Sequence, residues 1–256
     1  QGDSNALADL GLLYYLGRGV DQDHAAALRY FRLSAQGGNV AAQFNVGGMY
    51  EYGEGVLANF AIAAEWYLLA AEAGDADAQI ALGRLYESGA GVDHNPSTAE
   101  GWYLRAAMAD HPEGQFRYGY LTYRRGGERR YQEAMAWFLK AAAAGDTRAQ
   151  YNLGVMHESG HGTGMNVAQA QDWYQTAARG GHLGAQFRLG VLHSGSRASA
   201  ADLENAHVWY RAASEAGHTL AQVNLGVLYL QGRGVEMNPR QAAAWFRQAA
   251  EAGEPR

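Results

Sequence analysis

A two-part pattern recurs seven times along this 256-residue chain at an almost constant interval. The first part is a residue followed by glycine, and successive copies are 36, 36, 36, 35, 36 and 36 residues apart. The second part is a pair of aromatic residues, Tyr30-Phe31 in the first copy, which keeps the same spacing. A fixed period of this length predicts a solenoid, in which each unit packs on its neighbours. The glycine steps are Leu10-Gly11, Val46-Gly47, Leu82-Gly83, Tyr118-Gly119, Leu153-Gly154, Leu189-Gly190 and Leu225-Gly226.

Each period reads as two helices joined by a glycine-rich turn. The first helix, helix A, follows an Asp, Asn or His that can cap it, and it ends at a Gly-x-Gly turn. The second, helix B, follows another Asp or Asn and carries the aromatic pair. We therefore predict an all-α fold, with one solenoid over residues 1–256. The expected repeats are approximately 3–38, 39–74, 75–110, 111–145, 146–181, 182–217 and 218–253.

Two copies depart from the pattern. The fourth has lost one residue and its Gly-x-Gly turn, and its sequence at 122–132 predicts an irregular loop with four arginines. This basic cluster, in an otherwise acidic chain, is a second candidate site for an acidic partner or an anionic head group, while the alternative is a solvated loop. The sixth copy has lost the second glycine, and we expect Asp202 to cap its helix B. The basic cluster comprises Arg124, Arg125, Arg129 and Arg130.

The repeat resembles the Sel-one-like repeat family, a bacterial and eukaryotic relative of the tetratricopeptide repeat. The third copy fits the family motif almost letter for letter through Ala78, Leu82-Gly83, Tyr86, Gly89-x-Gly91-Val92, Ala99, Trp102-Tyr103 and Ala106-Ala107. The resemblance covers essentially the whole chain. It implies a right-handed superhelix of helix pairs with helix A on the concave side.

The resemblance also implies a class of function. Family members are generally non-enzymatic adaptors, and bacterial members include secreted or periplasmic interaction proteins, signalling regulators and toxin-immunity proteins. A periplasmic or secreted location is expected from the resemblance alone. The chain opens at Gln1, close to a repeat boundary, so we expect a truncated or processed N-terminus.

The composition of the chain excludes several classes of partner and of chemistry. The net charge of −6 and the isoelectric point near 5.8 argue against a nucleic-acid partner, which usually requires a basic surface. The chain has no cysteine, so disulfides and thiol chemistry are excluded. The sequence contains no apolar stretch of about 18 residues, so it predicts no membrane-spanning helix.

One short motif suggests metal chemistry. The residues from His157 to His161 match H-E-x-x-H, in which two histidines one helical turn apart bind zinc. Here, however, His157 occupies the tyrosine column of the repeat and Gly160 ends the helix, which places His161 in the turn. We therefore expect no metal, cofactor or catalytic residue, and a metal-dependent hydrolase is the less favoured alternative to a binding protein.

The most informative residues are those that the repeat does not dictate. Three columns of helix A, two residues before the glycine-step residue, two after it and one turn further, are unusually apolar and aromatic for a solvent-facing surface. We predict that they line a concave groove for another protein, with charged neighbours setting its register. The predicted groove residues are Phe44, Glu51, Ile80, Arg84, Glu87, Phe116, Tyr120, Tyr123, Tyr151, Val155, Phe187 and Val191.

Three alternatives remain open. Some of these side chains would pack into the core between repeats instead of facing the groove. A second alternative is that the chain is an immunity protein that neutralises a secreted toxin, for example a type VI secretion effector. A third is that the chain self-associates through its end repeats, since neither end shows a distinct polar capping helix.

Overall fold

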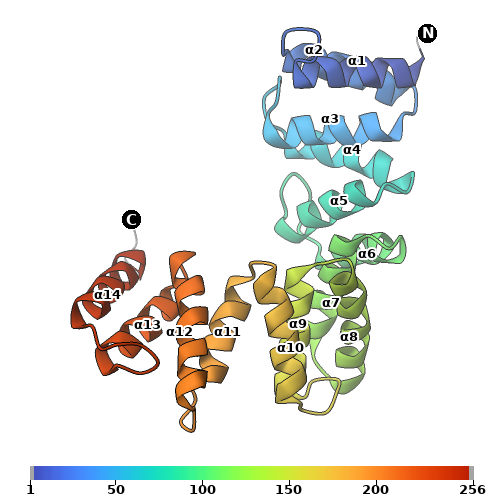
Figure 1. Cartoon of the computed structure of the whole chain (residues 1–256). Helices are drawn as coiled ribbons and strands as arrows, with labels where there is room; N and C mark the ends of the chain where they lie inside the picture. Colours follow the sequence, from blue (N-terminus) through green and yellow to red (C-terminus); the bar gives the residue numbers. More distant parts are fainter. Residues whose placement is uncertain (1–2, 254–256) are drawn as a thin grey trace. The chain divides into compact units, whose positions relative to one another are not determined.

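The computed structural model describes residues 3–253, which form fourteen helices and no strand (Figure 1). Each repeat supplies one helix A, with an odd number, and one helix B, with an even number. The first seven helices are α1 (Ser4–Leu16), α2 (His24–Gln36), α3 (Val40–Tyr52), α4 (Phe60–Glu72), α5 (Ala76–Ser88), α6 (Pro96–Met108) and α7 (Pro112–Arg125). The others are α8 (Glu128–Ala143), α9 (Thr147–Ser159), α10 (Val167–Arg179), α11 (Leu183–His193), α12 (Ala200–Glu215), α13 (Thr219–Gln231) and α14 (Pro239–Gly253).

The chain divides into two compact units, residues 1–121 and 122–256. In the first unit each helix from α1 to α6 packs on the next, and in the second unit the same holds from α8 to α14. Alanine columns such as Ala63, Ala99 and Ala170 are completely buried at these contacts. The predicted all-α architecture of stacked helix pairs is confirmed.

The predicted capping residues begin the A helices. Asp3, Asn39, Asp75 and Asp146 each accept a hydrogen bond from a backbone N–H of the first turn. His182 and His218 do the same through Nδ1, 3.2 Å from the amide nitrogens three residues on. An accepting Nδ1 carries no proton, so both rings are neutral with the hydrogen on Nε2. Burial lowers the pKa of both side chains, which favours this form.

The two glycines of the Gly-x-Gly turn have different structural roles. The first, as at Gly89, caps helix A in the left-handed conformation, as predicted. The second, as at Gly91, also has positive φ and lies against the start of helix B of the preceding repeat. A Cβ at Gly91 would lie 2.3 Å from the carbonyl carbon of Phe60. The second glycine is therefore a contact between repeats as well as a turn residue.

The glycine within helix A makes room for an aromatic ring. A Cβ at Gly47 would lie 2.6 Å from the ring of Tyr67, and one at Gly83 would lie 2.5 Å from the ring of Tyr103. Both rings are almost completely buried and come from helix B of the same repeat. These glycines therefore allow a close approach of the two helices, and the group that approaches is the second residue of the aromatic pair.

Two local predictions were wrong. The stretch at 122–132 is not a loop, because α7 continues to Arg125 and α8 begins at Glu128. Gly126 and Gly127, with φ of 70° and 94°, make the whole connection, and no side chain caps α8. Asp202 does not cap α12 either, because Ser199 is the N-cap and Asp202 completes a capping box from inside the helix.

A column of glutamines also links successive repeats. Gln79 donates to the carbonyl oxygen of Ala71, and Gln150 donates to that of Ala142, at 3.1 and 3.2 Å. In both cases the carbonyl belongs to the last turn of helix B in the preceding repeat, and it also accepts a hydrogen bond from the backbone N–H of Gly74 or Gly145. Gln43, Gln186 and Gln222 make equivalent bonds.

Candidate protein-binding groove

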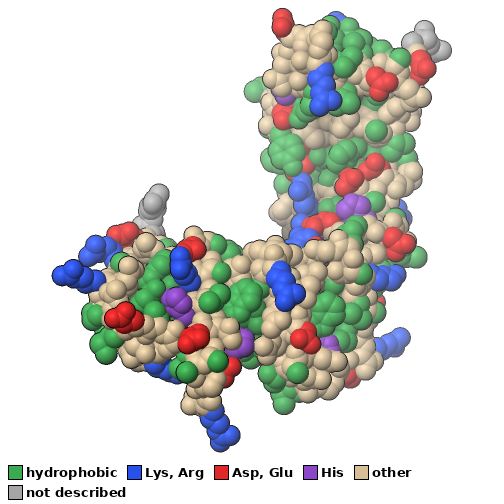
Figure 2. Space-filling view, viewed as in Figure 1, with side chains coloured by type: hydrophobic (Ala, Val, Ile, Leu, Met, Phe, Trp, Pro, Cys, Tyr) green, Lys and Arg blue, Asp and Glu red, His purple; other side chains and the backbone are tan. Residues whose placement is uncertain are grey.

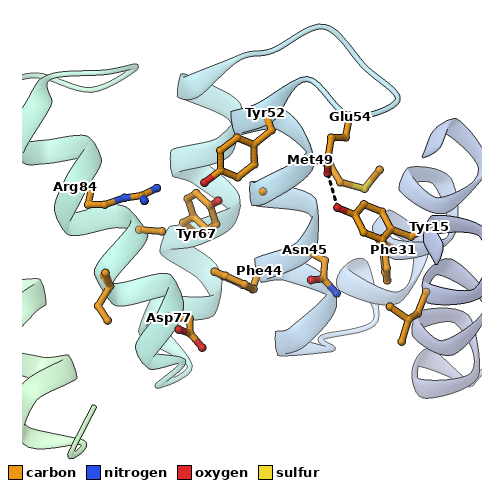
Figure 3. A pocket seen from close by; sticks show the side chains of 14 residues that line it. Tyr15, Phe31, Phe44, Asn45, Met49, Tyr52, Glu54, Tyr67, Asp77 and Arg84 are labelled. Carbon is orange, nitrogen blue, oxygen red and sulfur yellow. Dashed lines mark hydrogen bonds between the residues drawn. The ribbon is translucent and has the colours of Figure 1, made fainter. Parts of the chain in front are cut away.

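A pocket of about 340 Å³ lies in the first unit, between the A helices α1, α3 and α5 (Figure 3). Six of its lining residues come from the three predicted groove columns. They are Leu12, Tyr15, Phe44, Gly48, Ile80 and Arg84. Helix A of three successive repeats therefore contributes to one concave surface.

Other lining residues were not predicted. Tyr52, at the end of α3, is 66% exposed and lies over the pocket near Arg84, as Figure 3 shows. Asp77, in the first turn of α5, is also part of the lining, and its carboxylate lies 3.2 Å from Nε2 of His111. Glu54 follows α3 and accepts a hydrogen bond of 2.9 Å from the Tyr15 hydroxyl (Figure 3).

A second, shallower hollow of about 560 Å³ adjoins this pocket. It shares Tyr52 and Arg84 with the pocket, and it extends to Phe60 at the start of α4 and to Glu87 near the end of α5. Aromatic side chains and carboxylates therefore line both the pocket and the hollow beside it.

The predicted groove residues differ in how far they reach solvent. Ile80 is buried, with 8% of its surface exposed, although it lines the pocket. Glu87 and Tyr120 are exposed. The half-buried members are Phe44, Glu51, Arg84, Phe116, Tyr123, Tyr151, Val155, Phe187 and Val191.

Several glutamates of the groove columns hold buried tyrosines of their own repeat. The Tyr67 hydroxyl donates to Glu51 at 2.7 Å, and the Tyr103 hydroxyl donates to Glu87 at the same distance. Burial first, and then these hydrogen bonds, raise the pKa of both tyrosines. Tyr174 pairs with Glu158 in the same way at 2.5 Å, and Tyr210 pairs with Ser194 at 2.8 Å.

The second residue of the aromatic pair is Tyr only where the matching residue of helix A is Glu or Ser. Where the helix B residue is Phe, the matching helix A residue is Tyr or Leu, as in the pairs Phe31 with Tyr15, Phe138 with Tyr123, and Phe246 with Leu230. The two hydroxyls of Tyr15 and Tyr123 bond elsewhere, to Glu54 and to His161. The ring and the facing residue are thus matched within each of the seven repeats.

The same glutamates also contact an arginine of the following repeat. Arg84 lies 2.6 Å from Glu51, and Arg117 lies 3.6 Å from Glu87. In the second unit Arg188 lies 3.6 Å from Glu158. The Glu51 side chain is only 10% exposed, so its charge acts chiefly within the protein.

Two aromatic groove residues of the second unit stack on histidine caps. The Tyr151 ring lies 4.5 Å from that of His182, and the Phe187 ring lies 4.6 Å from that of His218, both nearly parallel. Each pair joins helix A of one repeat to the N-cap of the next helix A. Part of the aromatic surface of these residues is therefore used in contacts between repeats.

The basic cluster lies on two helix ends. Arg124 and Arg125 end α7, and Arg129 and Arg130 lie in the first turn of α8; all four side chains are exposed. Glu128 and Glu133 line the same shallow hollow as Arg129 and Arg130. Carboxylates are therefore interspersed with the arginines at this surface.

The H-E-x-x-H motif is divided between a helix and a turn. His157 is buried in α9, and burial lowers its pKa. His161 follows the helix, stacks on Tyr131 with ring centres 4.3 Å apart, and bonds through Nδ1 to the Tyr123 hydroxyl at 2.9 Å. Across residues 3–253, no group of three or more His, Cys, Asp or Glu side chains is arranged to hold a metal ion.

The first unit is strongly acidic. Residues 1–121 contain 15 Asp or Glu against 6 Arg and no Lys, a net charge of −9, whereas residues 122–256 contain 11 against 14 Arg or Lys, a net charge of +3. On the face shown in Figure 2, acidic side chains lie among hydrophobic ones over α1 to α5. In the described part of the chain no helix is both long enough and apolar enough to cross a membrane.

Comparisons with known proteins agree with this architecture. The Sel1 repeat profile matches residues 4–39, 40–75, 76–111, 112–146, 147–182, 184–218 and 219–254. Among curated proteins, none matches the chain. A Sel1 repeat protein from Oxalobacter formigenes is 32% identical, with a TM-score of 0.81 and 97% of each chain covered.

Two further solved structures are similar. The protective antigen c5321 of uropathogenic Escherichia coli is 30% identical with a TM-score of 0.58; the match covers 98% of this chain and 62% of that one. The immunity protein Pa5087 of Pseudomonas aeruginosa is 18% identical with a TM-score of 0.52, over 83% of this chain and 81% of that one. At 18% identity the likeness concerns the fold alone.

Proposed function

The chain belongs to the Sel1 repeat family, and we propose that it is a non-enzymatic scaffold that binds a partner protein in the groove lined by its A helices. Sel1 repeat scaffolds are typical of protein–protein interaction. The observation that carries the proposal is the pocket between α1, α3 and α5, to which three successive repeats contribute equivalent columns.

The physical argument is one of preorganisation. The groove side chains are held by contacts within and between repeats, such as the Glu51 bonds to Tyr67 and Arg84. A surface held in this way loses little conformational entropy on binding, so more of the contact energy appears as affinity. Exposed aromatic and apolar groups such as Tyr52 and Tyr120 are the usual energetic anchors of such interfaces.

An immunity protein is the second candidate. Its support is the fold shared with the Pseudomonas aeruginosa immunity proteins Pa5087 and PA5088, at 18% and 16% identity. This likeness bears on architecture, so the general scaffold role is the stronger proposal.

The test is affinity capture from an extract of the source organism, followed by mass spectrometry. The groove variant carries Leu12→Ser, Tyr52→Ser and Tyr120→Ser, at positions 45%, 66% and 40% exposed on three A helices of the first unit. Its matched control carries Leu33→Ser, Leu69→Ser and Leu139→Ser, at positions 47%, 47% and 44% exposed on three B helices.

We expect a protein that the wild type and the control variant retain and the groove variant loses. Circular dichroism must first show equal helix content in all three proteins. Equal retention by the groove and control variants would contradict the proposal.

A further inference from the structure

Two adjacent glycines in α3 are explained differently by packing. Glycine inside a helix costs about 1 kcal/mol relative to alanine. At Gly47 the cost has a structural reason, because a Cβ would lie 2.6 Å from the Tyr67 ring. At Gly48 the nearest atom to a Cβ would be the Tyr67 hydroxyl oxygen at 3.6 Å, which is an ordinary contact, and φ is not positive. Alanine would fit at Gly48, so packing does not explain this glycine.

Gly48 instead lines the pocket and keeps it open. The other repeats place a side chain at the same column, namely Leu12, Arg84, Tyr120, Val155, Val191 and Val227. Only the second repeat, in the middle of the three A helices around the pocket, has no side chain here. The resulting volume of about 340 Å³ is within the range of pockets that bind ligands. Its walls include Leu12, Phe44 and Ile80, which suit an apolar group.

The surroundings of the pocket favour positive charge in a ligand. The pocket and the adjoining hollow are lined by four carboxylates and one guanidinium group, that of Arg84. Arg84 is already paired with Glu51 at 2.6 Å, and Glu87 lies 3.6 Å from Arg117 outside the lining. Asp77 and Glu87 remain 66% and 45% exposed, and the unit around them has a net charge of −9. An acidic surface of this kind attracts basic segments and repels acidic ones.

We propose that this pocket binds an extended peptide segment of the partner in which a large apolar side chain, such as Leu, Met or Phe, is flanked by Lys or Arg. The inference rests on the proposed function and specifies the partner for that surface. The apolar side chain fills the space left by Gly48, and the flanking cations lie near Asp77 and Glu87. Tyr52, between the two hollows, offers an exposed ring against which the peptide packs.

The test uses a phage-displayed library of random 12-residue peptides, selected on the immobilised full-length chain. The selected peptides are then synthesised with a fluorescent label, and their affinity is measured by anisotropy. We expect peptides in which an apolar residue lies next to Lys or Arg. Their affinity should fall as salt is raised, because exposed charges are screened.

Gly48→Leu is the decisive variant because it fills the pocket without removing a contact. Its matched control is Gly101→Leu, since Gly101 lies exposed within α6 and a Cβ there meets nothing within 4 Å. We expect at least tenfold weaker binding for Gly48→Leu and unchanged binding for Gly101→Leu. Asp77→Asn should weaken binding several-fold. Thermal unfolding should show that Gly48→Leu is no less stable than the wild type, so that lost binding reports the pocket.

Three results would overturn the inference. They are selection of acidic peptides, absence of enrichment, and equal affinity for the wild type and Gly48→Leu. The proposed function would be judged separately by affinity capture. A partner lost by the groove variant but retained by Gly48→Leu would refute the pocket while leaving the scaffold role in place.

Discussion

The hydrogen bond between Tyr67 and Glu51 gives a direct test of how the helix pairs are held together. Tyr67→Phe removes only the hydroxyl, and the ring that packs on Gly47 stays in place. A hydrogen bond to a charged group contributes about 1.5–3 kcal/mol. Since Glu51 keeps its contact with Arg84 at 2.6 Å, its carboxylate is not left unpaired, and we expect a loss of about 1.5–2 kcal/mol, in the lower part of that range.

Hydrogen exchange measured by mass spectrometry suits this prediction, because repeat arrays do not always unfold as one cooperative unit. Protection of the α3 and α4 amides should fall about ten- to thirtyfold, since 1.4 kcal/mol corresponds to a factor of ten. The control is Tyr210→Phe, which loses a bond to the uncharged Ser194 and should cost about 1 kcal/mol. Unchanged protection of α3 and α4 in Tyr67→Phe would refute the reasoning.

Other substitutions test other contacts. Gly83→Ala should lower the melting temperature by several degrees or more, because its Cβ would lie 2.5 Å from the Tyr103 ring; an unchanged melting temperature would contradict this packing. Gly91→Ala should also destabilise, since φ is +72° and its Cβ would clash with the backbone of the preceding repeat; exchange in α4 and α5 should rise more than in α13. Burial lowers the pKa of His182 and His218 in the folded state, so the folded chain binds fewer protons than the unfolded one. The contribution of these two histidines to the free energy of unfolding is therefore complete above about pH 6.5, and it is lost as the pH falls through their folded-state pKa. Replacing both with Asn, a cap that does not titrate, should reduce the fall in melting temperature between pH 7.5 and 5; an equal fall would argue that other groups cause it.

The sequence carried enough information for the helices and too little for the pocket. Period, capping residues and the first glycine of each turn are local signals, so the helix pairs follow from them. The pocket depends on Tyr52 and Asp77, near the end of one helix and the beginning of another, and only the stacking of repeats brings them together. The role of Gly48 needed the structure as well, because the sequence shows that Gly48 is an exception in its column but not that a pocket lies beside it.

The two local errors have identifiable causes. Two consecutive glycines with positive φ reverse the chain in fewer residues than the Gly-x-Gly turn, so the shortened fourth repeat needs no loop. At Asp202 a better competing signal was present, because Ser199 precedes it by three residues and the pair forms a capping box. The match between ring and facing residue was also readable from the sequence, by comparing two columns across repeats instead of one.

That match has a consequence for how such a chain is lengthened or shortened. A chain that joined helix A of the second repeat to helix B of the seventh would place the Glu51 carboxylate against the Phe246 ring. Phe246 has no hydroxyl that could donate a hydrogen bond to this carboxylate. The reverse exchange would set the Tyr67 hydroxyl against Leu230. Duplication or deletion of a complete helix pair keeps each ring with its own partner. The helix pair, and not the single helix, is therefore the module that recombination or protein engineering can copy without penalty inside the repeat.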